Sequence, residues 1–267
     1  MRIVILGSGS SGNATYVELG EKRLLIDIGL SCHKVENELA KLHTSVRFLD
    51  GIFISHSHDD HIKGLRTLVG RATVPIFVGE QTQQEIATSS KAGSRVNLSH
   101  YPLLRRLEPD VLQTWPDSSL RVLPMRSSHD VQCFGFYLEA EEGNLVYYTD
   151  SGFLPKLYAP ILRNRDYYIF ESNYDPELLR TCKYPSCIKQ RIASDKGHMS
   201  NAYSAHCISN LVGARTKKVV LAHISENSNT PASALDTHRR ALQNVDFTLE
   251  RVVCAVQRQV LTVVDET

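Results

Sequence analysis

Five apolar, strand-like runs in this sequence each lead directly into a polar residue. "IFIS" leads into His56, "RVLPMRSS" into His129, "VYYT" into Asp150, "YIFE" into Ser172 and "VVLA" into His223. Ligands of open α/β sheets gather outside the carboxyl ends of strands, where adjacent loops converge. The pattern therefore predicts a fold in which five distant segments meet in one cleft.

Short β-rich runs alternate with helical patterns along nearly the whole chain, with no linker, repeat or low-complexity block between them. Strands are predicted at Arg2–Leu6, Ala14–Glu18, Arg23–Asp27, Gly51–Ser55, Ile76–Val78, Leu120–Met125, Phe134–Glu139, Leu145–Thr149, Tyr167–Phe170, Lys218–Ala222, Arg251–Val256 and Gln259–Val263. Helices are predicted at Cys32–Leu42, His61–Gly70, Glu80–Ser89, Pro176–Thr181, Ala202–Val212 and Ala232–Gln243. Meanders mixed with strand-helix units favour two sheets with helices outside them, in one domain spanning residues 1–267.

Charge and cysteine usage give little direct information about a partner. The chain has 30 Lys and Arg against 29 Asp and Glu, a formal net charge of +1, so no global charge favours a nucleic acid or a membrane. Six cysteines lie scattered without a CxxC pair, and no apolar run approaches the roughly 20 residues that span a bilayer. We expect reduced thiols in a cytoplasmic protein, with no membrane partner and no obligate protein partner.

The stretch "ISHSHDDHIKGL" concentrates three histidines and two aspartates within positions 56 to 61. After a strand the backbone stays nearly extended, so His56 and His58 point to the same side and can hold one ion. If Asp60 and His61 begin the next helix, their side chains diverge by about a third of a turn and aim at a second position. A polar loop is the alternative, since short motifs also occur by chance.

Two neighbouring ions need more ligands than this loop supplies. His129, Asp150 and His223 each follow a strand-like run and are the natural additions. Imidazole suits Zn, Fe, Ni or Mn, and carboxylates shift the preference towards the harder ions of that set. We expect two divalent ions, with Zn favoured by the number of histidines and Mn as the competitor.

The pattern His-x-His-x-Asp-His, followed by separate His, Asp and His residues, resembles the metallo-β-lactamase fold of binuclear hydrolases. The resemblance implies a four-layer αββα sandwich of two similar halves, with the metals at the common edge of the sheets. It also implies which residues hold each ion: His56, His58 and His129 hold one, Asp60, His61 and His223 hold the other, and Asp150 bridges them. Asp27 in "LLIDIG" matches an early acidic position that would fix a ligand histidine through its other ring nitrogen.

The charge of such a site favours an anionic substrate. Two divalent ions bring four positive charges, of which Asp60 and Asp150 neutralise two, so a phosphodiester would be attracted. Lactam-cleaving branches of the fold commonly place a cysteine where this chain has Asp150, and they are usually exported. Thioester hydrolases and lactonases share the all-oxygen-and-nitrogen ligand set, so the ligands alone leave a small-molecule hydrolase open.

His198 in "SDKGHMSN" resembles the Gly-His-Ser/Thr segment of RNase Z-like phosphodiesterases. An imidazole can donate the proton that a leaving alkoxide needs near neutral pH. The alternative is a loop histidine at the start of a helix near Asn201, although Ser200 or Asn201 would serve better as the helix cap.

The motifs "GSGSSGN", "LLIDIGLS", "SHSHDDHIKGL", "SSHD", "YYTDSG", "SDKGHMSN" and "LAHIS" resemble, in order, the YycJ/WalJ branch of the fold. That branch implies a cytoplasmic metal-dependent nuclease with exonuclease activity from a DNA 5′ end. By the same resemblance Ser11, Asn13, Ser172 and Asn173 are substrate-binding candidates in the cleft. "GSGSSGN" itself is either a phosphate-accepting nest or only a tight hairpin connection.

Our hypothesis is hydrolysis of DNA by a metal-activated bridging hydroxide, with Asp60 and Asp150 at the metals and His198 as general acid. The alternatives are a hydrolase of a cyclic phosphodiester, thioester or lactone, and a regulatory binding protein that keeps its metals for structure. The near-zero net charge gives no broad basic surface for DNA. Six basic residues before His198 are candidates for the rim of the cleft: Arg163, Arg165, Lys183, Lys189, Arg191 and Lys196.

Overall fold

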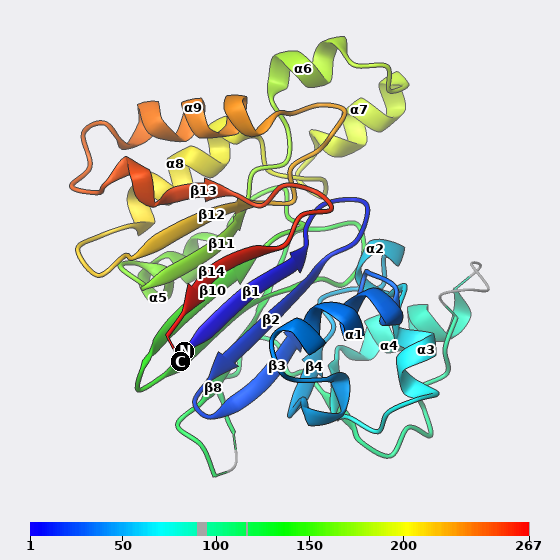
Figure 1. Ribbon diagram of the computed structural model, residues 1–267. Coiled ribbons are helices and arrows are strands. Elements are labelled where there is room, and N and C mark those ends of the chain that lie inside the picture. Colours follow the sequence, from blue (N-terminus) through cyan, green and yellow to red (C-terminus); the bar gives the residue numbers. More distant parts are fainter. Residues whose placement is uncertain (90–94, 116, 267) are drawn as a thin grey trace.

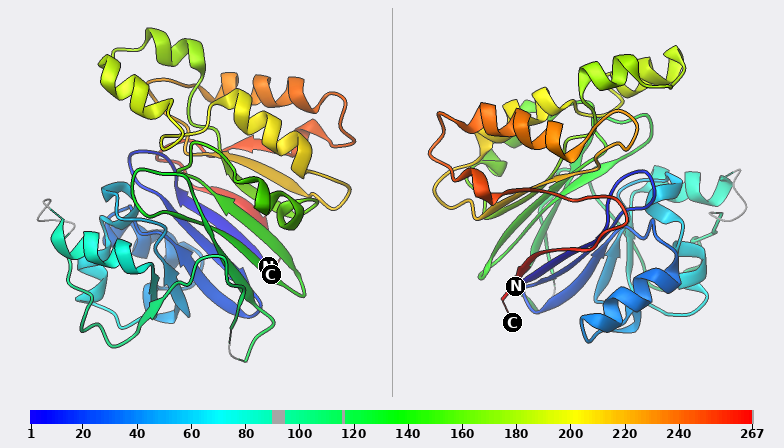
Figure 2. Two further views of the ribbon diagram at one scale, coloured as in Figure 1. Left: turned by 180° about the vertical axis from the view of Figure 1, so that it is seen from behind. Right: turned by 45° about the horizontal axis from the view of Figure 1, so that its top comes forward.

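The strands pair into two mixed sheets that pack face to face, with helices on both outer faces (Figures 1 and 2). The protein is seen here in a computed structural model that describes residues 1–89, 95–115 and 117–266. The first sheet has the order β14-β1-β2-β3-β4-β5-β6 and the second β13-β12-β11-β10-β9-β8-β7. The layer order confirms the predicted αββα sandwich.

Both sheets follow the same plan, an antiparallel half joined to a parallel half. The first contains β1 (Arg2–Gly7), β2 (Ala14–Leu19), β3 (Lys22–Ile26), β4 (Gly51–Phe53), β5 (Ile76–Val78), β6 (Leu104–Arg106) and β14 (Leu261–Asp265). The second contains β7 (Gln113–Thr114), β8 (Arg121–Arg126), β9 (Phe134–Ala140), β10 (Gly143–Tyr148), β11 (Tyr167–Glu171), β12 (Lys218–Ala222) and β13 (Val252–Cys254). Strands β3 to β6 run parallel in the first sheet, and β10 to β13 run parallel in the second. The carboxyl ends of the parallel strands therefore lie together at one edge of each sheet.

Strand β1 shows why the apolar runs are continuous rather than alternating. Ile3 and Ile5 belong to the core between the two sheets, whereas Val4 and Leu6 belong to the core beneath the helices. Successive side chains of a strand point to opposite faces, so a strand buried on both faces must be apolar at every position. The buried run "IVIL" at residues 3–6 meets that requirement.

The helices cover the sheets in two groups (Figure 1). The helices against the first sheet are α1 (Cys32–Lys41), α2 (Asp59–Ile62), α3 (Leu65–Val69) and α4 (Glu80–Thr88). Those against the second are α5 (Ala159–Leu162), α8 (Asn201–Leu211) and α9 (Pro231–Leu242), while α6 (Pro176–Thr181) and α7 (Ser186–Ile192) project beyond it. No helix in the described part of the chain is long and apolar enough to cross a membrane.

Two departures from the predicted elements have clear physical causes. The single helix predicted over His61–Gly70 is divided into α2 and α3, because the N–H of Gly64 donates to the carbonyl of Ile28, 2.8 Å away. Helix α7 was not predicted, and none of its residues is buried. Without a buried face, its sequence has no apolar periodicity to recognise. The short strands β6 and β7 were also missed.

Helix α9 packs against α8 through a buried histidine, His238. Its side chain has no exposed surface, its Nδ1 lies 2.9 Å from the carbonyl of Ala234, and its Nε2 lies 3.1 Å from Ser204 Oγ. Burial lowers the pKa of His238 to about 4. The ring is therefore neutral in the folded protein near neutral pH.

This burial predicts an acid-sensitive contribution to stability. Because the pKa is lower in the folded state than the ordinary 6.5, the unfolded chain binds the extra proton between pH 6.5 and about 4. Stability from this group is complete above pH 6.5 and falls by up to about 1.4 kcal/mol per pH unit as the pH decreases towards 4. Replacing His238 by Asn, which keeps a donor for Ala234, should flatten that part of the profile. Urea unfolding of both proteins between pH 5 and 7 measures the slopes, and equal slopes would contradict the assignment.

Candidate metal centre

The five strand-end segments predicted to converge do so at one edge of the sandwich. His56 and His58 follow β4, His129 follows β8, Asp150 follows β10, Ser172 follows β11 and His223 follows β12. Asp60 and His61 lie in the first turn of α2, which begins at Asp59. Four overlapping groups of potential ligands result among the described residues, and in each group the ligand atoms lie within 4.8 Å of one another. Two of them are named here: His56, His58 and His129 form the first triad, and Asp60, His61 and His223 form the second triad. The other two are His56, His61 and Asp150, and Asp150, Glu171, His198 and His223.

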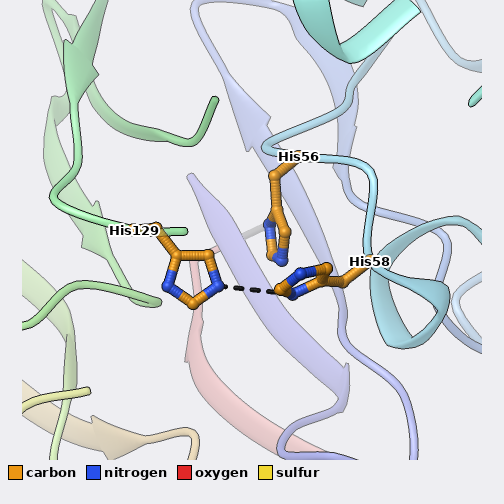
Figure 3. A group of neighbouring side chains, drawn as sticks. All are labelled: His56, His58 and His129. Atoms are coloured by element: carbon orange, nitrogen blue, oxygen red, sulfur yellow. Dashed lines mark hydrogen bonds between the residues drawn. The ribbon is translucent and has the colours of Figure 1, made fainter. Parts of the chain in front are cut away.

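The three rings of the first triad face a common centre (Figure 3). His129 Nε2 lies 3.3 Å from His58 Nδ1, and the His56 ring lies 4.6 Å from the His58 ring between centroids. His56 and His58 come from one loop and His129 from the other sheet. The first triad therefore joins the two halves of the sandwich.

The outward ring nitrogens of the first triad have partners of their own. His56 Nδ1 lies 3.0 Å from Ser55 Oγ, and His129 Nδ1 lies 3.2 Å from the carbonyl of Gly197. His58 Nε2 lies 3.3 Å from a carboxylate oxygen of Asp130. A partner for the outer ring nitrogen fixes the orientation of a ligand histidine. These contacts therefore turn the other nitrogen of each ring towards the common centre.

The second triad is oriented by buried carboxylates. His61 Nδ1 lies 2.7 Å from Asp27 Oδ2, and Asp27 also accepts from the backbone N–H and the hydroxyl of Ser55. His223 Nδ1 lies 3.2 Å from Glu171 Oε1. The structure thus places Asp27 where the sequence predicted it, against the far nitrogen of a candidate ligand.

Asp150 lies between the two triads. Its Oδ2 is 3.5 Å from His61 Nε2 and its Oδ1 is 3.5 Å from His223 Nε2, and it forms a third close group with His56 and His61. Asp27, Asp150 and His223 all have φ between 54° and 62°, a region that non-glycine residues rarely adopt. Such strain persists where surrounding contacts enforce it and gathers at functional sites.

Three buried atoms at this centre have no hydrogen-bond partner among the described residues: His56 Nε2, Asp150 Oδ2 and His223 Nε2. Leaving a buried polar atom unpaired costs roughly 1–3 kcal/mol, so native proteins rarely do so without a reason. Each of the three is a lone-pair donor directed into the cluster. The site therefore fits a divalent metal ion.

The charge balance differs between the triads. Burial, together with neighbouring imidazoles, lowers the pKa of each ring in the first triad, so these rings are neutral and ready to coordinate. In the second triad burial acts in the same direction, but Asp150, Asp27 and Asp60 outweigh it and raise the pKa of His61 to about 9. The carboxylates in and around the second triad thus favour positive charge at this position. A proton on the His61 ring supplies that charge where a cation would bind.

His198 lies beside both triads, with ring centroids 5.4 Å from His129 and 5.2 Å from His223. Its Nδ1 lies 2.7 Å from Glu171 Oε1, the same oxygen that contacts His223. Burial by itself raises the pKa of Glu171, but the charge of His198 and hydrogen bonds from both rings lower it overall. Ser200, not His198, caps helix α8 by accepting from the N–H of Tyr203.

Two of the predicted substrate-binding residues instead contact the histidines of the second triad. Asn13 Nδ2 lies 2.9 Å from His61 Nε2, and its Oδ1 accepts from the N–H of Gly9. Asn173 Nδ2 donates to the carbonyl of His223 and lies 3.1 Å from its Nδ1. Both asparagines are buried, although Asn173 also borders the pocket above the two triads.

The other two predicted contacts lie outside the pocket. Ser172 is completely buried and donates to Asn201 Oδ1, 2.7 Å away, so we no longer propose it as a substrate contact. Ser10 borders the pocket, whereas Ser11 does not. In "GSGSSGN" the N–H groups of Gly9, Gly12 and Asn13 already have acceptors within the protein. This favours the tight hairpin connection over the phosphate nest.

Sequence reasoning missed Ser55, Asp130 and Glu171, whose contacts orient the rings. Asp130 directly follows His129, and Glu171 ends the otherwise apolar strand β11. A glutamate at the inner end of a buried strand is uncommon, because an unpaired buried charge is costly. The position of Glu171 at the end of an apolar strand is therefore the sequence feature that could have identified it as a site residue.

The loop that carries Asp60 and His61 is held by a close backbone approach at Gly29. A Cβ atom at this position would lie 1.6 Å from the carbonyl oxygen of Asp60, which accepts from the N–H of Asn13. Neither backbone segment can move without breaking bonds to the other, since Ile28 N–H also donates to the carbonyl of His61. Only glycine fits between them.

We therefore expect Gly29→Ala to weaken metal binding at the second triad, because Asp60 and His61 must shift together. Overpacking of this kind costs typically about 1–3 kcal/mol of stability. Gly70→Ala is the matched control, since its Cβ would meet nothing closer than 3.6 Å. Metal titration calorimetry and urea unfolding of both variants measure the effects. Unchanged metal binding in folded Gly29→Ala would contradict the role of this contact.

Comparisons with known proteins agree with this geometry. The beta-lactamase superfamily domain matches residues 22–224. Exodeoxyribonuclease WalJ of Streptococcus pneumoniae serotype 2 (strain D39) is 35% identical, over 91% of this chain and 88% of the WalJ chain. Exodeoxyribonuclease YycJ of Bacillus anthracis is 30% identical, over 91% of this chain and 89% of the YycJ chain. The metallo-beta-lactamase fold protein YhfI from Bacillus subtilis superimposes with a TM-score of 0.67, covering 98% of both chains at 17% identity. The chain therefore belongs to the beta-lactamase superfamily, within the family of the WalJ and YycJ exodeoxyribonucleases.

Proposed function

We propose that this protein is a metal-dependent phosphodiesterase that acts as an exonuclease on DNA. The observation that carries the proposal is the pair of ligand triads sharing Asp150, with His198 and Glu171 beside them. The family is a class of hydrolases, and the names of two relatives, WalJ and YycJ, describe DNA exonucleases. Their similarity extends over nearly the whole chain and supports the same substrate class here.

We propose that the first triad and the second triad each hold one divalent ion, with Asp150 between them. Zn is favoured because five of the seven side chains are imidazoles, and Mn is the alternative because metal availability often outweighs ligand preference. Divalent ions at such a site activate water and neutralise the negative charge of a phosphodiester.

We assign to His198 the role of the general acid that protonates the leaving group. Its Nδ1 is held by Glu171, which leaves Nε2 as the nitrogen that can carry a transferable proton. Glu171 is itself fixed, because its Oε2 accepts from the N–H groups of Ser151 and Met199. Glu171 is thus a positioning residue that keeps the His198 ring in one orientation beside the metal ligands.

The depth of the site supports attack at the end of a strand. His56 and His61 have no exposed surface, Asp150 is 2% exposed and His223 is 4% exposed. The pocket above them is bordered on its far side by Ile192 and neighbouring residues of α7. A phosphodiester at a free strand end reaches such a recessed site more directly than one within a continuous duplex.

Two further proposals concern the whole chain. We propose one domain over residues 1–267, since β14 at the carboxyl end pairs with β1 at the amino end. We also propose a reducing, cytoplasmic location, which the six free cysteines support.

The function is tested with metal-loaded protein on end-labelled single- and double-stranded DNA, beside cyclic phosphodiester, thioester and lactone substrates. We expect release of nucleotides from DNA ends and slow turnover of the small esters. His198→Ala should lower the rate on DNA by about 10²–10⁴-fold, because the leaving oxygen loses its proton donor. Its metal content should equal that of the parent.

His206→Ala is the matched control, because His206 is an exposed histidine on α8, away from the pocket. It should digest DNA at the parental rate. Preferential turnover of a small ester with intact DNA would instead support a small-molecule hydrolase. DNA binding without turnover would support a regulatory binding protein, and a fully active His198→Ala would remove the role assigned to that residue.

A further inference from the structure

The pocket above the metal centre has a second wall that does not contribute a metal ligand. It is formed by α7 and the segments on either side of it, which project beyond the second sheet (Figure 1). The residues of this wall that border the pocket are Tyr184, Ile188, Arg191, Ile192 and Lys196. We call this set the α7 wall.

Arg191 is held at the edge of the first triad. Its Nε donates to Asp130 Oδ2 at 3.0 Å and its Nη2 also contacts that oxygen. The other oxygen of Asp130 lies 3.3 Å from His58 Nε2 and from His129 Nε2. The Arg191 side chain is 57% exposed, so its remaining guanidinium donors can reach a ligand beside the proposed metal centre.

Lys196 is the second cation of the α7 wall. It is exposed, it borders the pocket two residues before His198, and no ion pair or hydrogen bond of its ammonium group is found within the described residues. An exposed ammonium next to a proposed phosphodiesterase centre has the charge and reach to contact a phosphate.

The remaining predicted rim cations do not border the pocket. Lys189 Nζ donates to the carbonyl of Arg180, Arg163 Nε donates to the carbonyl of Asn210, and the guanidinium of Arg165 lies over the Tyr137 ring. Lys183 also lies outside the pocket lining. Of the six candidates, Arg191 and Lys196 are the two that face the site.

An aromatic ring lies on the same wall. Tyr184 borders the pocket, and its hydroxyl accepts from Asn227 Nδ2 at 2.8 Å, which ties the α6–α7 connection to the loop after β12. Ile188 adds an apolar surface one turn further along α7. Bases of single-stranded nucleic acids stack on aromatic side chains, whereas paired bases are already stacked in the duplex.

We propose that the α7 wall is a binding site for one nucleotide of a single-stranded DNA end. Arg191 and Lys196 contact the phosphate next to the scissile one, and Tyr184 stacks on the base. The proposal rests on the proposed function and adds the part of the substrate that the metal centre does not touch. Asp130 connects the two sites, because it contacts both the first triad and Arg191.

The test measures binding separately from cleavage. A 3′-fluorescein-labelled oligothymidylate with phosphorothioate linkages, which resist hydrolysis, is titrated with metal-loaded protein by fluorescence anisotropy at several salt concentrations. Lys196→Ala should weaken binding several-fold and reduce the slope of log K against log salt by about 0.7, the value for one lost phosphate contact with a single strand. Lys183→Ala, an exposed lysine of the same segment outside the pocket, should match the parent.

Tyr184 provides a second, charge-independent readout. Tyr184→Ala should weaken binding by about 10-fold through loss of stacking. Tyr184→Phe should bind as the parent does, because it keeps the ring and loses only the contact with Asn227. A Phe variant as weak as the Ala variant would show that bracing of the loop, not stacking, matters.

The outcomes separate this proposal from the proposed function. Equal affinity and salt slope for the Lys196 and Lys183 variants would overturn the α7 wall as a phosphate site, even if the parent digests DNA. No binding of the single strand by the parent, or stronger binding of the matching duplex, would also overturn it. Binding that depends on Lys196 and Tyr184 in a protein that leaves unmodified DNA intact would retain the site and refute the exonuclease function.

Discussion

The carboxylate of Asp150 connects the two halves of the sandwich at one buried point. It follows β10 of the second sheet and lies 3.5 Å from both His61, which follows a strand of the first sheet, and His223, which follows a strand of the second. Burial by itself raises the pKa of Asp150, but the charges of His223 and His61 hold it well below its ordinary value. A buried anion needs such compensation, so the loops that supply it are fixed relative to one another. The recessed pocket and both triads depend on this arrangement.

Contacts to the outer ring nitrogens of the triad histidines turn the other ring nitrogens towards the centre of the site. Asp27 contacts the outer nitrogen of His61, and Glu171 contacts that of His223. Ser55 contacts the outer nitrogen of His56. Glu171 also contacts His198, so one carboxylate orients both a candidate metal ligand and the proposed proton donor. Asp27 and Glu171 are themselves held by backbone N–H groups, so they fix the orientation of the rings that they contact. Asp130 extends these contacts to the surface, because it contacts His58 and also exposed Arg191.

The parts of the fold that could be predicted are those whose signal is local. Apolar runs located the long strands, and the spacing from His56 to His61 indicated two ligand positions on one loop. Helix α7 has no buried residue, so no pattern marks it, although it forms a wall of the pocket. The division of the helix after Ile62 depends on a backbone bond between Gly64 and Ile28, which no local pattern encodes. Ser172 shows the converse, since its strand-end position was correctly read but its side chain turns into the core to meet Asn201.

The central claim is that the two triads hold two divalent ions on either side of Asp150. Anomalous diffraction from crystals of protein purified without chelators, recorded at the Zn and Mn absorption edges, tests it most directly. We predict two peaks, one among His56, His58 and His129 and one among Asp60, His61 and His223, each within bonding distance of Asp150. A fully ordered site with no peak, or with a single ion bound away from Asp150, would contradict the account.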